Sequence, residues 1–151
     1  MTADCRLTVT VRPAGDAAEI DAAMDLRVRV FVGEQGVDAE EEVDELDAQS
    51  LQIVGVDDTG VIATCRLREL GRGEWKLERM VVDRRLRRLG VGARLLDGAE
   101  RQARERGGRE MVLHAQRRAE AFYASQGYVA EGDTFLEAEI EHVRMRKALD
   151  A

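Results

Sequence analysis

Hydrophobic positions in the first part of the chain predict one strand followed by one helix. Residues 6–12, RLTVTVR, alternate apolar and polar side chains and are rich in Val and Thr, as strands are. Asp16 and Glu19 have the spacing of a capping box, which predicts the start of a helix. As far as Gly33, apolar residues then recur on one helical face: Ile20, Met24, Val28 and Phe31.

The middle of the chain predicts a loop and three strands. Residues 33–50 are polar and acidic, which is typical of a loop with at most a short helical turn. Residues 51–70 contain two apolar runs on either side of DDTG, a turn signature that indicates a hairpin. GRG at 71–73 predicts a second turn, and EWKLERMVV at 74–82 predicts a third strand.

The second half predicts two more helices and three more strands. Apolar residues recur at helical spacing from Val91 to Ala103, and the glycine pair at 107–108 ends this helix. Residues 110–116 lack polar alternation, as expected of a buried strand. A short helix is predicted over 117–128, and two strands follow it.

The resulting order is β-α-loop-β-β-β-α-β-α-β-β, which predicts an α/β fold. No linker or repeat interrupts the 151 residues, so we expect one domain over 1–151. The net charge of −7 argues against binding nucleic acid by overall charge. The sequence has no run of about 18 apolar residues and no apolar leader, so we expect a cytoplasmic protein with no membrane partner.

Cysteines and histidines give no metal signature. Cys5 and Cys65 are far apart and form no CxxC motif, so we expect reduced thiols. Together with His114 and His142 they lack the spacing of zinc ligands, and no metal site is expected.

Charge is concentrated in two segments of opposite sign. Residues 34–50 contain eight acids and no base, whereas residues 84–94 contain five arginines and no acid. Each run could be a solvated face, which is the usual role of such runs. Two opposite patches in a small domain also fit an enzyme with one anionic and one cationic substrate.

The basic segment has a second feature, because it leads through two glycines into a helix. DRRLRRLGVGARLL, residues 83–96, follows an apolar strand and places Gly90 and Gly92 at the helix start. Free amides and the dipole at a helix start attract anions, and glycine lets the backbone approach a phosphate closely. The segment therefore predicts a phosphate or diphosphate cradle, with a plain strand-to-helix turn as the alternative. It matches neither a P-loop nor a dinucleotide fingerprint.

These motifs together resemble the GNAT superfamily of acyl-CoA N-acyltransferases. Residues 87–93 match R/Q-x-x-G-x-G/A, LERMVV resembles the family's central strand, and FYASQGY at 122–128 resembles its F-Y-x-x-x-G-F/Y element. VFVGEQGV, LHAQ and HVRMRK further resemble the bacterial ElaA-like branch. The pair Arg88-Leu89 departs from the Gly-Arg or Gly-Lys of many members. The resemblance implies a mixed central sheet of about six or seven strands flanked by helices.

The resemblance also implies acetyl-CoA as co-substrate. Met80, Val81 and Val82 would pair their backbone with the pantetheine arm and hold the thioester carbonyl. The C-terminal strands of this fold often form dimers, so a homodimer is left open. Backbone amides of the loop would bind the diphosphate: Arg87, Arg88, Leu89, Gly90, Val91, Gly92 and Ala93.

Amine acetylation then needs an acid for the leaving thiolate and a base for the amine. By the resemblance, Tyr123 faces the sulfur and is the candidate general acid; a packed core tyrosine is the alternative. Glu78 is the candidate base or water-positioning residue, on the assumption that strand alternation gives it the same face as Met80 and Val82. An ion pair with a neighbouring arginine is its alternative role. Neither cysteine has a partner base, so we expect direct transfer to the amine.

The acidic loop is expected over the acceptor side of the cleft, where it would attract a cationic amine. Glu34 and Asp44 are its candidate acceptor-binding residues, and Glu34 is also the alternative to Glu78 as the base. His114, at the end of the fifth strand, and His142, in the last strand, are further candidates for the same site. Each histidine could equally be a hydrogen-bonded structural residue.

Two alternatives remain open. Arg27-x-x-x-Phe31, Glu42-x-Asp44-x-x-Asp47, Arg66 and Arg68 also resemble acyl-homoserine-lactone synthases, which bind S-adenosylmethionine with acids. The chain is short for that family and lacks its Trp after the Phe, so we interpret the match as a fold motif in which Arg27 pairs with Asp44 or Asp47. The other alternative is a sensor that binds acyl-CoA without turnover.

Overall fold

A computed structural model describes residues 8–37 and 45–149 of the chain. Seven strands form one sheet in the order β1-β2-β3-β4-β5-β7-β6, in which only β4 and β5 pair in parallel. This confirms the α/β class and the mixed sheet. The strands are β1 Thr10–Pro13, β2 Leu51–Asp57, β3 Gly60–Gly71, β4 Glu74–Val82, β5 Glu110–Gln116, β6 Val129–Glu137 and β7 Ile140–Ala148.

Helical segments lie between the strands. Asp16 caps the first helix by accepting from the amide of Glu19 at 2.9 Å, as the capping-box spacing predicts, while the Glu19 carboxylate accepts from the amide of Gly15. The helix continues to Glu34 as a π-helical segment, which the periodicity does not predict. The segments are α1 Ala17–Arg27, η1 Val28–Glu34, η2 Glu45–Gln49, η3 Arg84–Leu86, α3 Val91–Glu105, η4 Arg117–Ala119 and α4 Glu120–Ser125.

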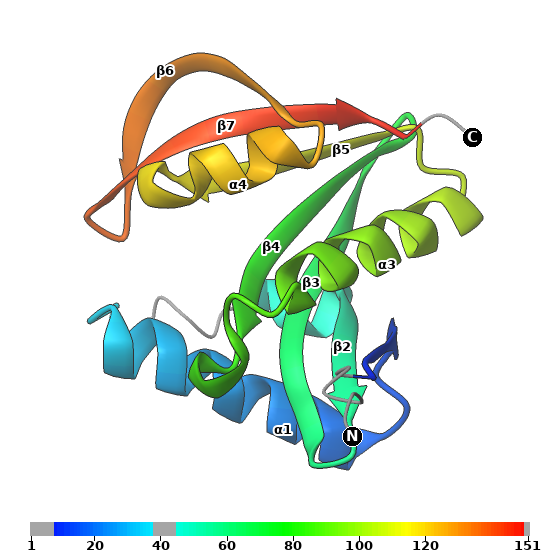
Figure 1. The fold of residues 1–151 in the computed structure, drawn as a ribbon. Helices are drawn as coiled ribbons and strands as arrows, with labels where there is room; N and C mark the ends of the chain where they lie inside the picture. Colours follow the sequence, from blue (N-terminus) through cyan, green and yellow to red (C-terminus); the bar gives the residue numbers. More distant parts are fainter. Residues whose placement is uncertain (1–7, 38–44, 150–151) are drawn as a thin grey trace, which may run out of the picture.

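Helices cover both faces of the sheet (Figure 1). The larger core lies under α3, where Leu95, Leu96 and Ala99 contact buried residues of the strands. A smaller core of Leu26, Val30 and Val81 lies on the α1 side. Strand β4 is therefore packed on both faces, which holds the middle of the sheet in place.

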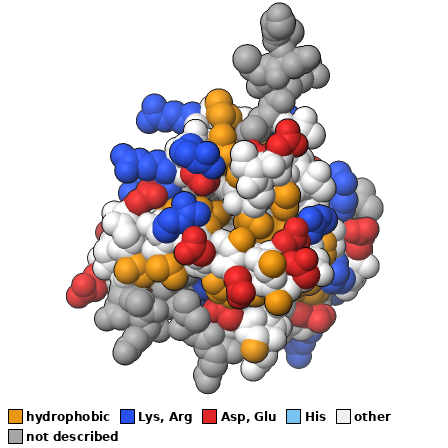
Figure 2. Space-filling model, turned by 90° about the horizontal axis from the view of Figure 1, so that it is seen from below, with side chains coloured by type: hydrophobic (Ala, Val, Ile, Leu, Met, Phe, Trp, Pro, Cys, Tyr) orange, Lys and Arg blue, Asp and Glu red, His pale blue; other side chains and the backbone are white. Residues whose placement is uncertain are grey.

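The side of the molecule that carries α1 has both apolar and charged side chains on its surface. Seen from below, hydrophobic, basic and acidic side chains are interspersed over it (Figure 2). Such a face is unlike the continuous basic surface with which proteins bind nucleic acid. Within the described ranges, no helix is long and apolar enough to cross a membrane.

Two features of β4 shape the site. Its pairing with β5 covers only Glu74–Leu77 opposite Glu110–Leu113, so the two strands diverge beyond Leu77 (Figure 1). The register with β3 shifts by one residue between Thr64 and Arg66, where Arg79 has a φ of 56°. A bulge of this kind re-aims the side chains that follow it.

Candidate active site

The diverging strands open a cleft of about 930 Å³ that passes through the sheet. On the α3 side it is lined by Gly92 and Tyr123. Leu113 and Ala115 belong to the core under α3, so alternation along β5 places His114 on the opposite face, and His114 also lines the cleft. A thioester and an acceptor could therefore enter from opposite faces of the sheet and meet between β4 and β5.

The start of α3 has the free backbone amides that an anion cradle would need. The first helical hydrogen bond runs from the amide of Arg94 to the carbonyl of Gly90 at 3.2 Å, so the amides of Val91, Gly92 and Ala93 precede it and lack an intrahelical acceptor. Gly90 caps the helix with a φ of 81°, a left-handed conformation that favours glycine. Nothing lies within 4 Å of the position where a Gly90 Cβ would sit.

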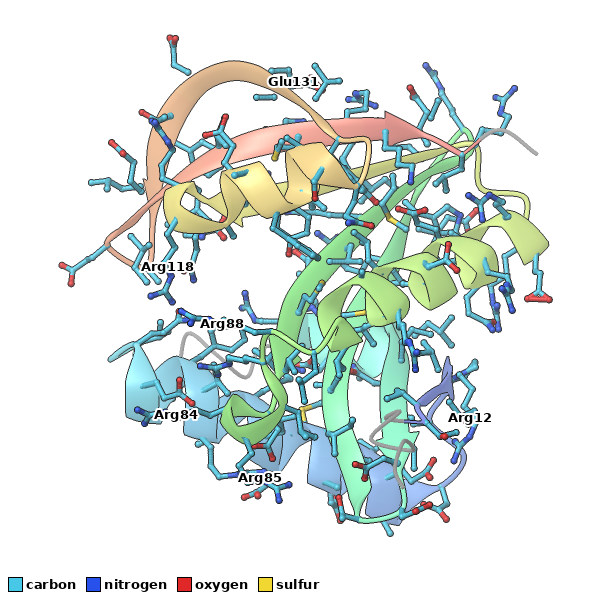
Figure 3. The ribbon with its side chains drawn as sticks, in the orientation of Figure 1. Arg12, Arg84, Arg85, Arg88, Arg118 and Glu131 are labelled. Carbon is cyan, nitrogen blue, oxygen red and sulfur yellow. The ribbon has the colours of Figure 1, made fainter. Side chains whose placement is uncertain are left out.

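The arginines around the cradle have separate roles. Arg88, in the loop before α3, lies at the opening of the cleft, and Arg118, in η4, lies on the opposite side of that opening (Figure 3). Arg85 instead pairs with Asp83, with Nε 3.3 Å from Oδ1. Arg88 and Arg118 thus place two cationic side chains on the cleft, and cations of this kind attract an anionic ligand.

Glu34, which the sequence analysis gives as a candidate for binding the acceptor amine, instead pairs with Arg87 in the structure. Its carboxylate accepts hydrogen bonds of 2.8 and 3.2 Å from Arg87, and this pairing lowers the pKa of Glu34. Arg87 also donates to the carbonyl of Val82 at 3.1 Å. The pair ties the end of η1 to the cradle loop. Asp44, the other acidic candidate, lies outside the described residues.

The other residues predicted to bind the cofactor differ in whether their side chains reach the cleft. Met80, Val82 and Ala93 line the cleft. The side chain of Val91 is buried in the core, and that of Leu89 is exposed to solvent. These two residues could therefore contribute to the cradle only through their backbone. Val81 lines the cleft while packing toward Leu26 on the α1 side.

Tyr123 lies on α4 with its hydroxyl over the central strand. The hydroxyl donates to Sδ of Met80 at 3.5 Å, and the ring makes edge contacts with Phe122 and Tyr128. Burial raises the pKa of Tyr123, so the phenol keeps its proton at neutral pH. A protonated hydroxyl beside the strand that would hold the thioester is suitably placed to act as an acid.

Glu78 points to the other face of β4 from Met80 and Val82, so the shared face predicted by strict alternation is wrong. The bulge at Arg79 reverses the alternation, and Met80 and Val82 pack toward the α3 core. The carboxylate of Glu78 lies 2.9–3.2 Å from three cationic side chains, those of Arg66, Arg68 and Lys76. Although burial opposes ionisation, these cations lower its pKa to about 2. Such a carboxylate is a weak proton acceptor, and the geometry favours the ion-pair role.

A buried ion network extends from Glu78 to α1. Arg66 also contacts Asp47 at 3.0 Å, and Asp47 accepts from fully buried Arg27 at 2.6 Å. The predicted pairing of Arg27 is confirmed for Asp47. Because two arginines bind this carboxylate, it is not available to hold the ammonium group of S-adenosylmethionine, as the lactone-synthase alternative would need.

Both candidate histidines line the cleft, together with a carboxylate that the sequence analysis missed. Nδ1 of His114 lies 2.9 Å from Oε1 of Glu137, and Nε2 of His142 lies 3.8 Å from Oε2 of the same residue. The ring of Phe135 makes an edge contact with His114 and stacks on His142. Glu137 is 23 residues from His114, and no local spacing connects the two.

Metal or thiol chemistry finds no support in the described part of the chain. Across 8–37 and 45–149, no group of three or more His, Cys, Asp or Glu side chains is arranged to hold a metal ion. Cys65 is a free thiol with no solvent exposure, and burial raises its pKa. A buried, protonated thiol is inert as a nucleophile. Cys5 lies outside the described residues.

Comparison with known proteins agrees with this geometry. Residues 19–149 match the model of the acetyltransferase (GNAT) domain. The chain is 38% identical over 135 residues to the uncharacterized N-acetyltransferase YjcF of Bacillus subtilis, covering 89% of this chain and 96% of that one.

Solved structures with the same fold include ElaA of Escherichia coli. It has a TM-score of 0.80 and 22% identity, over 93% of this chain and 99% of that one. An aminoglycoside 6′-N-acetyltransferase complexed with coenzyme A has a TM-score of 0.77 and 16% identity, over 94% and 98% of the two chains. The fold is thus one on which a CoA complex has been solved.

Proposed function

The chain belongs to the GNAT acetyltransferase family, and from this premise we propose that it transfers an acetyl group from acetyl-CoA directly to a primary amine. The observation that carries the proposal is the junction of the α3 cradle with the cleft between β4 and β5. The cradle suits the diphosphate, and the edge of β4 beyond Leu77 offers backbone groups to the pantetheine amides. A protein with the same fold has been solved in complex with coenzyme A, which is consistent with CoA as the co-substrate.

The proposed reaction needs no covalent enzyme intermediate. The amine lone pair attacks the thioester carbonyl, the C–S bond breaks, and the thiolate takes a proton from Tyr123. A backbone amide of β4 near Met80 would stabilise the oxyanion. This distribution of roles agrees with the protonated state of Tyr123 and with the inert thiol of Cys65.

Calorimetry with CoA, followed by thiol release from acetyl-CoA with a panel of primary amines, tests the proposal. We expect saturable binding of one CoA per chain and thiol release that depends on the amine. Binding with no release across a broad panel would favour the sensor alternative. Failure to bind CoA at millimolar concentration would refute the proposal.

A further inference from the structure

We propose that His114 is the base that deprotonates the acceptor ammonium group, and that Glu137 is the residue that positions it. This inference rests on the proposed acetyl transfer, to which it adds the identity of the proton acceptor. It begins with the placement of His114 as the first residue of β5 beyond the pairing with β4. The ring therefore lies where the two strands diverge, on the face opposite the α3 core.

The contact with Glu137 fixes which ring nitrogen is free. Hydrogen bonding from His114 lowers the pKa of Glu137, so its carboxylate is ionised and can only accept hydrogen bonds. Nδ1 of His114 must then carry the proton that bridges the 2.9 Å contact. In the neutral ring Nε2 holds the lone pair, and in the described structure it has no hydrogen-bond partner. The carboxylate–imidazole pair is a common way to prepare a histidine as a base.

The surroundings hold this pair in place. His142 donates from Nδ1 to the carbonyl of Ile140 at 2.7 Å, which fixes its ring beside Glu137. Phe135 lies between the two histidine rings and contacts both. The ring of His114 is thus held by the hydrogen bond to Glu137 and by the edge contact with Phe135, which in turn stacks on the fixed ring of His142.

Glu78 is a poorer base for the same cleft. Three cations surround its carboxylate, whereas the described partner of His114 is a single anion. An anionic partner stabilises the imidazolium ion that forms when the ring accepts a proton. Charged and titratable groups from every neighbouring element share a cleft with the pair, and Arg144 on β7 lies opposite His114 in the sheet. Those in the clefts include Glu34 on η1, Arg66 and Arg68 on β3, Lys76, Glu78 and Arg79 on β4, Arg118 on η4 and His142 on β7.

Each proton that leaves the amine nitrogen has an acceptor in the proposed reaction. Nε2 of His114 accepts one proton from the ammonium group and later releases it to solvent. The freed lone pair forms the C–N bond, the C–S bond breaks, and the thiolate takes the proton of Tyr123. The second nitrogen proton, lost as the amide forms, returns through solvent to the oxygen of Tyr123.

Kinetics of His114→Gln and Glu137→Gln, with an amine that the wild type acetylates, test the proposal. At pH 7 we expect kcat/KM for the amine to fall about 100-fold or more in His114→Gln and about 10-fold in Glu137→Gln. The Kd for CoA should stay within about twofold of wild type in both. Glu131→Gln is the matched control, because Glu131 is on the same strand but its ion pairs, with Arg146 at 2.7 Å and Arg144 at 3.9 Å, include neither histidine.

The pH dependence separates a base from a structural residue. Free amine increases about tenfold per pH unit below the amine's pKa, so the defect of His114→Gln should shrink as pH rises toward that pKa. A defect that stays constant with pH would overturn the proposal, as would a His114→Gln variant with wild-type kcat/KM at pH 7.

Nitrogen NMR of the imidazole rings needs no acceptor. We expect neutral His114 to carry its proton on Nδ1 in the wild type, and to lose this preference in Glu137→Ala. A wild-type ring protonated on Nε2 would overturn the inference even if acetyl transfer is observed. If CoA binds but no amine is acetylated, the proposed acetyl transfer is contradicted, and the assignment of His114 as its base is contradicted as well.

Discussion

Replacing Asp47 with Asn should strongly destabilise the protein, because Asp47 neutralises two buried guanidinium groups. The side chains of Arg27 and Arg66 are 0% and 1% exposed, and that of Asp47 is 10% exposed. Asn has nearly the same shape as Asp, but it carries no charge and so leaves Arg27 and Arg66 without this carboxylate. Breaking a buried pair in this way typically costs about 3–5 kcal/mol.

The pKa of Asp47 gives a second measure of how much its ionised carboxylate contributes to folding stability. Burial opposes its ionisation, but hydrogen bonds and charge from Arg27 and Arg66 lower the pKa from 3.8 to about 2. A carboxyl whose pKa is lowered this far on folding contributes about 2 kcal/mol of folding stability at neutral pH. Because the folded pKa is depressed, this stability is present above about pH 4 and is lost as pH falls toward 2.

Urea unfolding followed by circular dichroism measures the effect. With a slope of about 2 kcal/mol/M, a loss of about 3 kcal/mol moves the midpoint down by about 1.5 M at pH 7. Asp25→Asn is the matched control, because Asp25 is 72% exposed and pairs only across a helix turn with Arg29; it should change stability by less than about 0.5 kcal/mol. The reasoning is refuted if both variants lose the same stability, or if the Asp47→Asn deficit does not shrink between pH 4 and pH 2.

Three further predictions address the cradle, the acid and the packing of α3. Gly92→Asp should weaken CoA binding at least about 100-fold by calorimetry, since a carboxylate about 5 Å from a phosphate is repelled by about 3 kcal/mol. Gly92→Ala should bind nearly normally, because its Cβ would lie 3.5 Å from Met80; equal binding by both variants would contradict the cradle. Tyr123→Phe should lower kcat at least about 10-fold with CoA affinity unchanged, and an unchanged kcat would remove the hydroxyl from the mechanism. Gly98→Ala should destabilise the fold by about 1–3 kcal/mol in urea, because the new Cβ would lie 2.7 Å from Cβ of Val11, and a neutral result would contradict this close packing.

Much of the fold could be predicted from local pattern. The helix from Val91 follows its helical periodicity, and the strands at 74–82 and 110–116 follow from apolar runs that begin after glycine-containing turns. The cradle was predictable because all its parts, a strand end, two glycines and a helix start, are contiguous in sequence.

Features that depend on tertiary structure could not be predicted in this way. The bulge at Arg79 arises from the register between β3 and β4, so strict alternation placed Glu78 on the wrong face. Glu34 and Arg87 are 53 residues apart, and their pairing depends on how the end of η1 meets the cradle loop. Glu137 gives no local signal, because its role depends on a contact between β5 and β6 across the intervening β7.

A crystal structure of the chain with CoA tests the central claim most directly. The account predicts the diphosphate at about 3 Å from the backbone amides between Gly90 and Ala93, with the pantetheine arm along β4 beyond Leu77. A diphosphate bound elsewhere, with the start of α3 left to solvent, would contradict it.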